Sequence, residues 1–209
     1  MLSHRPAPWV AVVPVKPLRS AKTRLRGAVP AAVHPDLVLA MARDTVAAVL
    51  ACRAVARVVV VCDDPAVRAE LTRLGATCVP DTPAAGLNAA LTFGARGADG
   101  PVVALTADLP ALRATDLESA LAAAERAGRR AFVPDQEGTG TVLLASPPGV
   151  PLAPHFGPGS AAAHLRSGAT RLDGTWPSLR RDVDTAADLH AATSLGVGTH
   201  TGQVICTVA

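Results

Sequence analysis

Three aspartates stand where a carboxylate could serve as a ligand for a divalent cation. Asp108 follows the apolar run 102–105 and lies near the carboxyl end of an expected buried strand. Asp182 and Asp184 are two residues apart, so in an extended segment their side chains point to the same side, about 7 Å from each other. Mg²⁺ prefers oxygen ligands and is usually held by one or two carboxylates together with substrate phosphates. The trio therefore predicts a site for one or two Mg²⁺ ions; the alternative is a turn at Asp108 and a helix cap at Asp184 or the threonine after it.

A basic segment follows the first apolar run. Residues 16–24 hold four cationic side chains, Lys16, Arg19, Lys22 and Arg24. Fixed cations can neutralise a triphosphate, although a solvated basic turn would have the same composition. The segment has neither a G-x-G-x-x-G nor a G-x-x-x-x-G-K-[ST] pattern, which argues against a dinucleotide-binding fold and against a P-loop.

Two glycine-containing segments have the composition of anion-binding loops. Residues 138–141 read Gly-Thr-Gly-Thr, and residues 156–160 read Phe-Gly-Pro-Gly-Ser ahead of a helical stretch. Glycine lets backbone N–H groups approach a phosphate, and a helix start adds unpaired N–H groups, but ordinary turns look the same. Gly86 and Asn88 open another helix, where the Asn88 amide could hydrogen-bond a base or a ribose, or cap the helix.

The elements that must position these side chains are short aliphatic runs that alternate with segments of helical spacing. The aliphatic runs lie at residues 10–15, 58–61, 102–105, 131–133 and 142–144. The helical segments lie at residues 37–49, 65–74 and 115–127. Continuous apolar runs of this length indicate strands buried on both faces. The alternation predicts an α/β fold with an open, doubly wound, mostly parallel sheet, whose ligand crevice lies at the carboxyl ends of the strands.

Composition limits the classes of partner. The 209 residues include no linker-like segment, which predicts a single domain with a core at about 9–196 and a C-terminal tail at 198–209. A net charge of only +3, without a basic block interleaved with aromatics, argues against nucleic acid. The apolar runs are far shorter than the ~20 residues of a membrane span, so we expect a cytoplasmic protein with no membrane partner. Four cysteines without C-x-x-C spacing indicate buried free thiols.

Taken together and in this order, the segments resemble one family. These segments are similar to those of the guanylyltransferases of deazaflavin coenzyme (F-420) biosynthesis, called CofC in archaea and FbiD in mycobacteria. They are the basic loop 15–25, Gly86 to Asn88, Asp108 with Leu109 and Pro110, the two glycine loops, and Asp182 to Thr185. The resemblance covers about residues 9–196. It departs from the family at Ala186, where a proline is common, and in the proline-rich stretch 146–154.

The resemblance implies a Rossmann-like nucleotidyltransferase fold and transfer of GMP from GTP to a three-carbon phospho-acid. In bacterial relatives the acid is generally phosphoenolpyruvate, and in archaeal ones it is 2-phospho-L-lactate; 3-phosphoglycerate is a further alternative. The implied catalytic and Mg²⁺-binding residues are Asp108, Asp182 and Asp184. The residues implied to hold the phospho-acid are Thr141, Gly157 and Ser160. Those expected to face GTP are Lys16, Lys22, Arg24, Gly86 and Asn88.

Two rival functions remain open from the residues alone. One is a nucleotidyltransferase with another acceptor, such as a sugar phosphate or a molybdopterin, which the missing glycine-rich first loop argues against. The other is a non-catalytic nucleotide-binding module, which would bind GTP without releasing pyrophosphate. The sequence does not decide between a monomer and a homo-oligomer.

Overall fold

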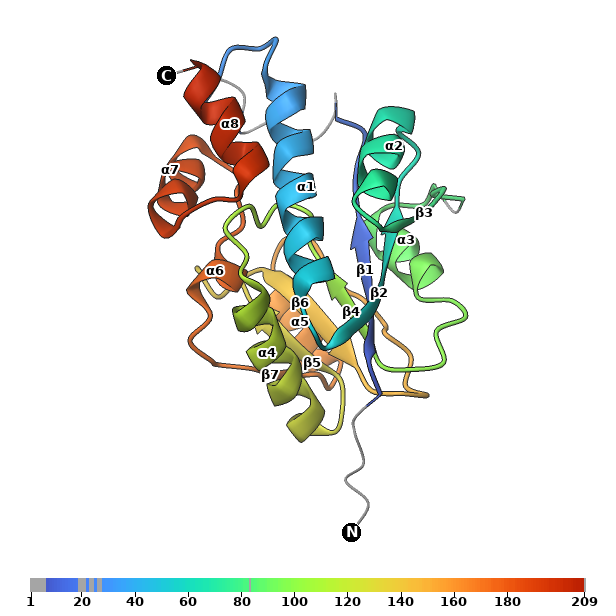
Figure 1. Cartoon of the computed structure of the whole chain (residues 1–209). Coiled ribbons are helices and arrows are strands. Elements are labelled where there is room, and N and C mark those ends of the chain that lie inside the picture. The colour runs from blue at the N-terminus through green and yellow to red at the C-terminus, as the bar shows by residue number, and fades with distance from the viewer. Residues whose placement is uncertain (1–6, 19–21, 23–24, 26–27, 83, 209) are drawn as a thin grey trace.

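The fold is built on one seven-stranded sheet with helices on both faces (Figure 1). The computed structural model describes residues 7–18, 22, 25, 28–82 and 84–208. The strands are β1 (Trp9–Pro14), β2 (Val55–Val61), β3 (Thr77–Val79), β4 (Val102–Leu105), β5 (Ala131–Pro134), β6 (Thr141–Ser146) and β7 (Thr170–Arg171). The helices are α1 (His34–Ala51), α2 (Pro65–Arg73), α3 (Leu87–Gly94), α4 (Ala114–Ala127), α5 (Ser160–Arg166), α6 (Pro177–Arg180), α7 (Ala186–Leu195) and α8 (Thr199–Val208).

The predicted α/β architecture is confirmed. Each of the five aliphatic runs lies in a strand, and the three helical segments are α1, α2 and α4. α2 begins at Asp64, whose carboxylate accepts hydrogen bonds from the backbone N–H groups of Ala66 and Val67. α4 ends at Gly128, where a left-handed φ of 62° stops the helix. The elements β3, β7 and α6 were not predicted because they are very short, and α8 was not predicted because threonine, glycine and β-branched residues, which are poor helix formers, make up most of it.

The sheet order is β3-β2-β1-β4-β6-β5-β7, and β6 is the exception to parallel pairing. β1 is parallel to β2 and β4, whereas β6 is antiparallel to both β4 and β5. Only residues 135–140 connect β5 to β6, and a parallel connection would need a crossover of a dozen or more residues. The reversal puts the amino end of β6, Thr141, at the same sheet edge as the carboxyl end of β4.

Two apolar layers cover the sheet. The larger one packs α1, α2, α4, α6 and α7 on one face, with side chains such as Leu117 and Leu121 fully buried. The smaller one packs α3 and α5 on the other face around Phe132 and Phe156. Helices on both faces make the sheet doubly wound, as predicted. All four cysteines are free, but the expectation of burial holds only for Cys52 and Cys62, since Cys78 is partly buried and Cys206 is exposed on α8.

The C-terminal segment packs against the core instead of extending away from it as a tail. Residues 199–208 form α8, which lies beside α1 (Figure 1) and packs Val204 against the core. The buried Asp44 carboxylate of α1 accepts hydrogen bonds from the backbone N–H groups of His200 and Thr201, at 3.1 and 2.7 Å. Gly198 precedes them, and a Cβ there would lie 2.3 Å from Asp44 Cγ, so only glycine fits. No helix in the described part of the chain is long and apolar enough to span a membrane.

Candidate active site

The carboxyl edge of the sheet brings the two acidic segments together. The backbone carbonyl of Asp108, which follows β4, accepts a hydrogen bond from the backbone N–H of Val183 at 3.0 Å. Val183 is fully buried in the core, so in this extended stretch its neighbours Asp182 and Asp184 lie on the other side. Of the two caps considered for α7, Asp184 or Thr185, the cap is Thr185. The carboxylate of Asp184 is thereby left for other contacts.

A buried threonine on α1 holds the backbone on both sides of Asp108. Thr45 Oγ1 accepts a hydrogen bond from the Leu109 N–H at 3.0 Å and lies 3.2 Å from the Ala107 carbonyl oxygen. The N–H of Gly198, just before α8, donates to the Pro110 carbonyl at 2.8 Å. Sequence reasoning missed Thr45, because a lone threonine within a helical pattern carries no signal of a distant contact. The turn at Asp108 is therefore held by Thr45 on α1, by Val183 in the segment before α7 and by Gly198 in the segment before α8.

Lys22 joins the two acidic segments. Its ammonium donates hydrogen bonds to Asp108 Oδ2 and to Asp184 Oδ1. Burial opposes the charged form of Lys22, but the negative charges of Asp108 and Asp184 outweigh it and raise the pKa of the ammonium above its ordinary value. The sequence assigned this lysine to the triphosphate, whereas in the structure it forms ion pairs with two aspartates.

Asp182 lies close enough to this ion-paired group for the charges of Asp108 and Lys22 to affect the pKa of its carboxyl. Burial raises the pKa of its carboxyl, and the negative charge of Asp108 raises it further, to about 7. The positive charge of Lys22 offsets only part of this increase. Ionisation of Asp182 therefore opposes folding.

Asp182→Asn is expected to raise the melting temperature of the protein in EDTA at pH 8. An acid whose native pKa exceeds its unfolded pKa costs stability as it ionises, so the wild type should lose stability as the pH rises from 3.8, the ordinary value, to about 7. The variant lacks this loss and should melt a few degrees higher, because 1 kcal/mol shifts the melting temperature of a chain of this size by about 2–4 °C.

Melting curves in EDTA from pH 5 to pH 8 measure this effect. The exposed Asp99 offers a matched control, because it precedes β4 whereas Asp108 follows it, so Asp99→Asn removes the same charge at the opposite end of that strand and leaves the pH dependence unchanged. If Asp182→Asn followed the wild-type pH dependence, the charge repulsion inferred here would be absent.

The oxygen atoms of this cluster fit a divalent cation. Among the described residues, no group of three His, Cys, Asp or Glu side chains is arranged as a closed metal site. However, Asp108 Oδ1 is buried without a hydrogen-bond partner. The Lys22 ammonium contacts the carboxylates of both Asp108 and Asp184, so one cation can bind to the two carboxylates together. Surplus negative charge, carboxylate donors and an unpaired buried oxygen are the chemistry that Mg²⁺ requires. The residues present therefore suit the predicted ion.

The loop at residues 138–141 holds an anion of its own, which corrects the expectation that its N–H groups face a phosphate. The N–H groups of Thr139 and Gly140 donate to the two carboxylate oxygens of Asp135, at 3.0 and 2.8 Å. The Gly138 N–H donates to the backbone carbonyl of Asp135 at 3.1 Å. Sequence reasoning could not foresee this, because an aspartate that closes its own loop has the composition of any turn. The last residue of the loop, Thr141, remains at the sheet edge.

Asn88 holds the second glycine loop in place. Its side-chain Nδ2 donates to the Phe156 carbonyl at 3.0 Å, and its Oδ1 accepts from the Phe156 N–H at 2.8 Å. Gly86 is the N-cap of α3, so the alternative of an Asn88 cap is wrong. Beyond Phe156, Gly157 and Gly159 adopt φ values of 137° and 69°, which let the chain turn into α5. Asn88 thus connects the start of α3 to the loop predicted to bind the phospho-acid.

The two glycine loops meet at the start of α5. The Ala161 N–H donates to the Thr139 carbonyl at 3.1 Å, which joins the loop before β6 to the loop before α5. Thr141 and Ser160, which end these loops, are both buried. Thr106, at the end of β4, has a buried hydroxyl without a partner in the described part of the chain, and sequence reasoning did not single it out. Hydroxyl groups therefore lie near the sheet edge that carries the aspartates.

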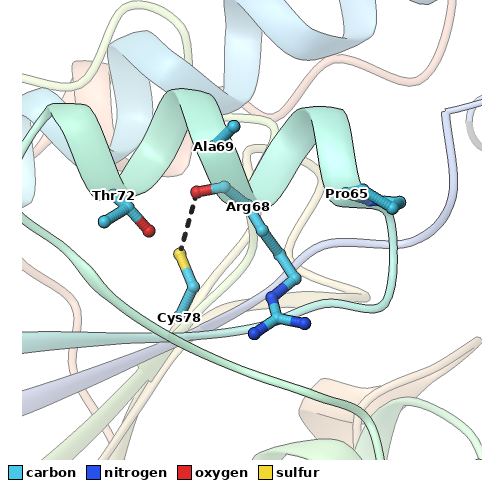
Figure 2. Close-up of a pocket in the computed structure, with 5 residues that line it drawn as sticks. All are labelled: Pro65, Arg68, Ala69, Thr72 and Cys78. Atoms are coloured by element: carbon cyan, nitrogen blue, oxygen red, sulfur yellow. Dashed lines mark hydrogen bonds between the residues drawn. The ribbon is translucent and has the colours of Figure 1, made fainter.

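Two predicted nucleotide-binding residues remain. Lys16 is exposed just after β1, and Arg24 lies outside the described residues. An open pocket of about 350 Å³ lies between α2 and β3. It is lined by Pro65, Arg68, Ala69, Thr72 and Cys78, which Figure 2 shows. The Cys78 thiol donates to the Arg68 carbonyl across it at 3.6 Å. This pocket shares no residue with the acidic cluster or with the glycine loops.

Comparison with known proteins decides the family. A MobA-like NTP transferase domain matches residues 31–176, a range that contains Asp108 and begins after the basic loop. The chain is 59% identical over 204 residues to a phosphoenolpyruvate guanylyltransferase of Salinispora arenicola, with 96% of this chain and 95% of that protein covered. The chain belongs to the phosphoenolpyruvate guanylyltransferase family. A member from Geodermatophilus obscurus is 55% identical over 203 residues, covering 94% of each chain.

Solved structures agree with the fold of a phosphoenolpyruvate guanylyltransferase family member. A nucleotidyl transferase from Methanothermobacter superposes with a TM-score of 0.63 at 19% identity, over 90% of this chain and 97% of that one. A CMP-2-keto-3-deoxy-manno-octonic acid synthetase, solved with CTP, superposes with a TM-score of 0.55 at 17% identity, over 90% and 98%. The Rossmann-like nucleotidyltransferase fold predicted from sequence is confirmed.

Proposed function

We propose that this protein transfers GMP from GTP to phosphoenolpyruvate and releases pyrophosphate, as a step in deazaflavin coenzyme F-420 biosynthesis. An oxygen of the phosphoenolpyruvate phosphate attacks the α-phosphorus of GTP, and the bond from that phosphorus to the bridging oxygen of the β-phosphate breaks. The products are a mixed diphosphate, enolpyruvoyl-2-diphospho-5'-guanosine, and pyrophosphate. The relatives named phosphoenolpyruvate guanylyltransferase, at 59% and 55% identity over nearly the whole chain, support this reaction.

The single observation that carries the proposal is the convergence of Asp108, Asp184 and Lys22 at the carboxyl edge of the sheet. A ligand crevice is expected at that edge in an open α/β sheet. Two carboxylates with a lysine between them supply both signs of charge there. This arrangement suits a reaction between two polyanions. The carboxylates can bind a metal cation, and the lysine supplies fixed positive charge for the leaving group.

The chemistry needs positioning and charge neutralisation more than proton transfer. A phosphate oxygen is already ionised at neutral pH, so no general base and no covalent enzyme intermediate are required. Asp108, Asp182 and Asp184 are the residues that would hold Mg²⁺, and a bound Mg²⁺ would neutralise phosphate charge and orient the reacting groups. Lys22 would then lie beside the phosphates of GTP, with Lys16 and Arg24 as the further cations of the same loop.

The glycine loops would bind the acceptor. Thr141, Gly157 and Ser160 are proposed to hold the phospho-acid, because their loops are joined by the hydrogen bond from Ala161 to Thr139 and lie at the edge that carries Asp108. Gly86 and Asn88 are proposed to lie beside GTP. For Asn88 the hydrogen bonds to Phe156 suggest a second task, which is to hold the acceptor loop relative to the nucleotide.

The organisation of the chain follows from the same proposal. Strands from Trp9 to Arg171 enter one sheet, and α7 and α8 pack on it or on its helices, which supports a single nucleotidyltransferase domain over residues 1–209. The substrates are small anions, so the partners proposed are GTP and phosphoenolpyruvate, with no role for nucleic acid. We propose that the reaction takes place in the cytoplasm, where both substrates are made.

Pyrophosphate release tests the proposal. GTP with Mg²⁺ is supplied with phosphoenolpyruvate, 2-phospho-L-lactate or 3-phosphoglycerate in separate reactions, and ATP and CTP replace GTP as controls. We expect release with GTP and phosphoenolpyruvate. Release with only one of the other acids would reassign the acceptor. Silence with all three, from folded protein that binds GTP in calorimetry, would refute the proposal in favour of a nucleotide-binding module.

A further inference from the structure

His164 is a buried histidine that the proposed reaction does not use. It lies on α5, fully buried, with its ring 5.6 Å from the Phe132 ring and 5.3 Å from the Phe156 ring, centroid to centroid. Burial, followed by repulsion from His155 and Arg130, lowers the pKa of the imidazole to about 4. The ring is therefore neutral near pH 7, with one protonated and one unprotonated nitrogen.

The surroundings of the ring decide which nitrogen carries the proton. The backbone N–H of His155 points at His164 Nε2, at an N···N distance of 2.9 Å. A backbone N–H can only donate, so Nε2 must be the unprotonated acceptor. The proton of the neutral ring is then on Nδ1. Nδ1 lies 2.9 Å from Thr141 Oγ1 and must donate to it.

This direction has a consequence for the threonine. Because Thr141 Oγ1 accepts from His164, its own hydroxyl hydrogen cannot point back at the ring and has to donate elsewhere. In the part of the chain that the structure describes, Thr141 Oγ1 has no second hydrogen-bond partner. The residue is 6% exposed and begins β6 at the sheet edge where Asp108 follows β4. The hydroxyl is therefore a fixed donor, without a protein acceptor, at the edge where the substrates are expected.

We propose that His164 is a positioning residue that holds the Thr141 hydroxyl as a hydrogen-bond donor to an anionic oxygen of the acceptor. The proposal rests on the proposed function, since it needs a phosphorylated acid at this edge. The same ring also fixes the backbone at His155, next to the Phe156 backbone that Asn88 holds. His164 thus orients the hydroxyl of Thr141 at the end of one glycine loop and holds the backbone of His155, just before the other glycine loop.

Two substitutions separate these tasks. Thr141→Val keeps the shape of the side chain and removes the hydroxyl, and a hydrogen bond to a charged group is worth a factor of about 10 to 100, so KM for phosphoenolpyruvate should rise by that factor. KM for GTP should stay within about twofold of the wild type, since the hydroxyl faces the acceptor only. His164→Gln can still accept from the His155 N–H but is not placed to donate to Thr141, so it should raise the same KM.

The decisive readout is the coupling between the two changes. In the Thr141→Val background, His164→Gln should cause little further rise in KM for phosphoenolpyruvate, because the donor that it orients is already gone. If the two effects multiplied, His164 would act only by supporting the fold and the proposal would be overturned. Thr141→Ser, which keeps the hydroxyl, should retain most of the wild-type affinity, and loss equal to that of Thr141→Val would also overturn it.

A measurement that does not depend on turnover tests the hydrogen-bond direction itself. Nitrogen-15 NMR of the histidine side chains at pH 7 should show His164 neutral and protonated at Nδ1. A ring protonated at Nε2, or at both nitrogens, would overturn the inference. Wild-type protein that releases no pyrophosphate with any acid would instead remove the proposed function, a failure that the NMR result distinguishes from an error about His164.

Discussion

Asp108→Asn is expected to lower pyrophosphate release with phosphoenolpyruvate by at least about 10³-fold, because removal of one group that neutralises transition-state charge typically costs 10²–10³ and Asp108 also holds Lys22. Asparagine has the same shape, and the hydrogen bonds that hold this turn go to backbone atoms of Ala107, Asp108, Leu109 and Pro110. The fold should therefore persist, with a melting temperature within a few degrees of the wild type.

Steady-state turnover and thermal melting measured on the same preparation check this prediction. Asp99→Asn is the matched control, since it makes the same chemical change at an exposed position and should leave turnover unchanged. Near-normal turnover by Asp108→Asn would remove Asp108 from the mechanism. A collapsed melting temperature would mean that the carboxylate serves the fold.

Lys22→Met is expected to reduce turnover by about 10²-fold or more and to destabilise the metal-free protein. The ammonium contacts both Asp108 and Asp184, and leaving the largely buried Asp108 carboxylate without this partner is costly. Methionine has a similar length and no charge. Added Mg²⁺ should therefore raise the melting temperature of Lys22→Met by more than it raises that of the wild type, because the aspartates then have no other cation beside them.

Melting curves with and without Mg²⁺, together with turnover, measure both effects. Lys22→Arg keeps the positive charge and serves as the control; it should recover much of the stability and only part of the turnover, because a guanidinium has a different shape. An equal Mg²⁺ response in Lys22→Met and the wild type would show that Lys22 and the ion do not share these carboxylates.

Sequence reasoning located the acidic cluster because the rule behind it is topological. Asp108 follows a buried run, and in an α/β sheet the carboxyl ends of parallel strands share an edge, so its position was predictable. The alternation of Asp182 and Asp184 around the apolar Val183 was equally readable from spacing. The backbone hydrogen bond between Val183 and Asp108 could not be predicted from the residue spacing, because it joins two segments that lie far apart in the sequence.

Most of the corrections have a common physical origin in contacts between distant segments. Asp135 is the exception, because its carboxylate accepts from the nearby N–H groups of Thr139 and Gly140, and a loop closed in this way has the composition of any turn. The amide of Asn88 could have capped a helix or bound a base, and its contact with Phe156 depends on where α5 packs. The segment at 199–208 has weak helical signals, and its order depends on the cap provided by Asp44 on α1.

The proton on His164 is another case of a property that sequence cannot give. The sequence places His164 in the helical stretch after the glycine loop 156–160. Which of its nitrogens is protonated depends on the direction of one backbone N–H, that of His155. Thr141 was assigned to the acceptor by resemblance alone. The hydrogen-bond direction now gives a physical reason for that assignment, which the coupling experiment tests.

The fate of the α-phosphate of GTP tests the central claim most directly. GTP labelled at the α-phosphorus and, separately, at the γ-phosphorus is incubated with phosphoenolpyruvate, Mg²⁺ and the protein, and the products are separated. We predict that the α-label enters a guanosine diphosphate linked to the acid and that the γ-label appears in pyrophosphate, one molecule for each acceptor consumed. An α-label that stays in GDP, or that appears in free GMP without an acid adduct, would contradict guanylyl transfer to the phospho-acid.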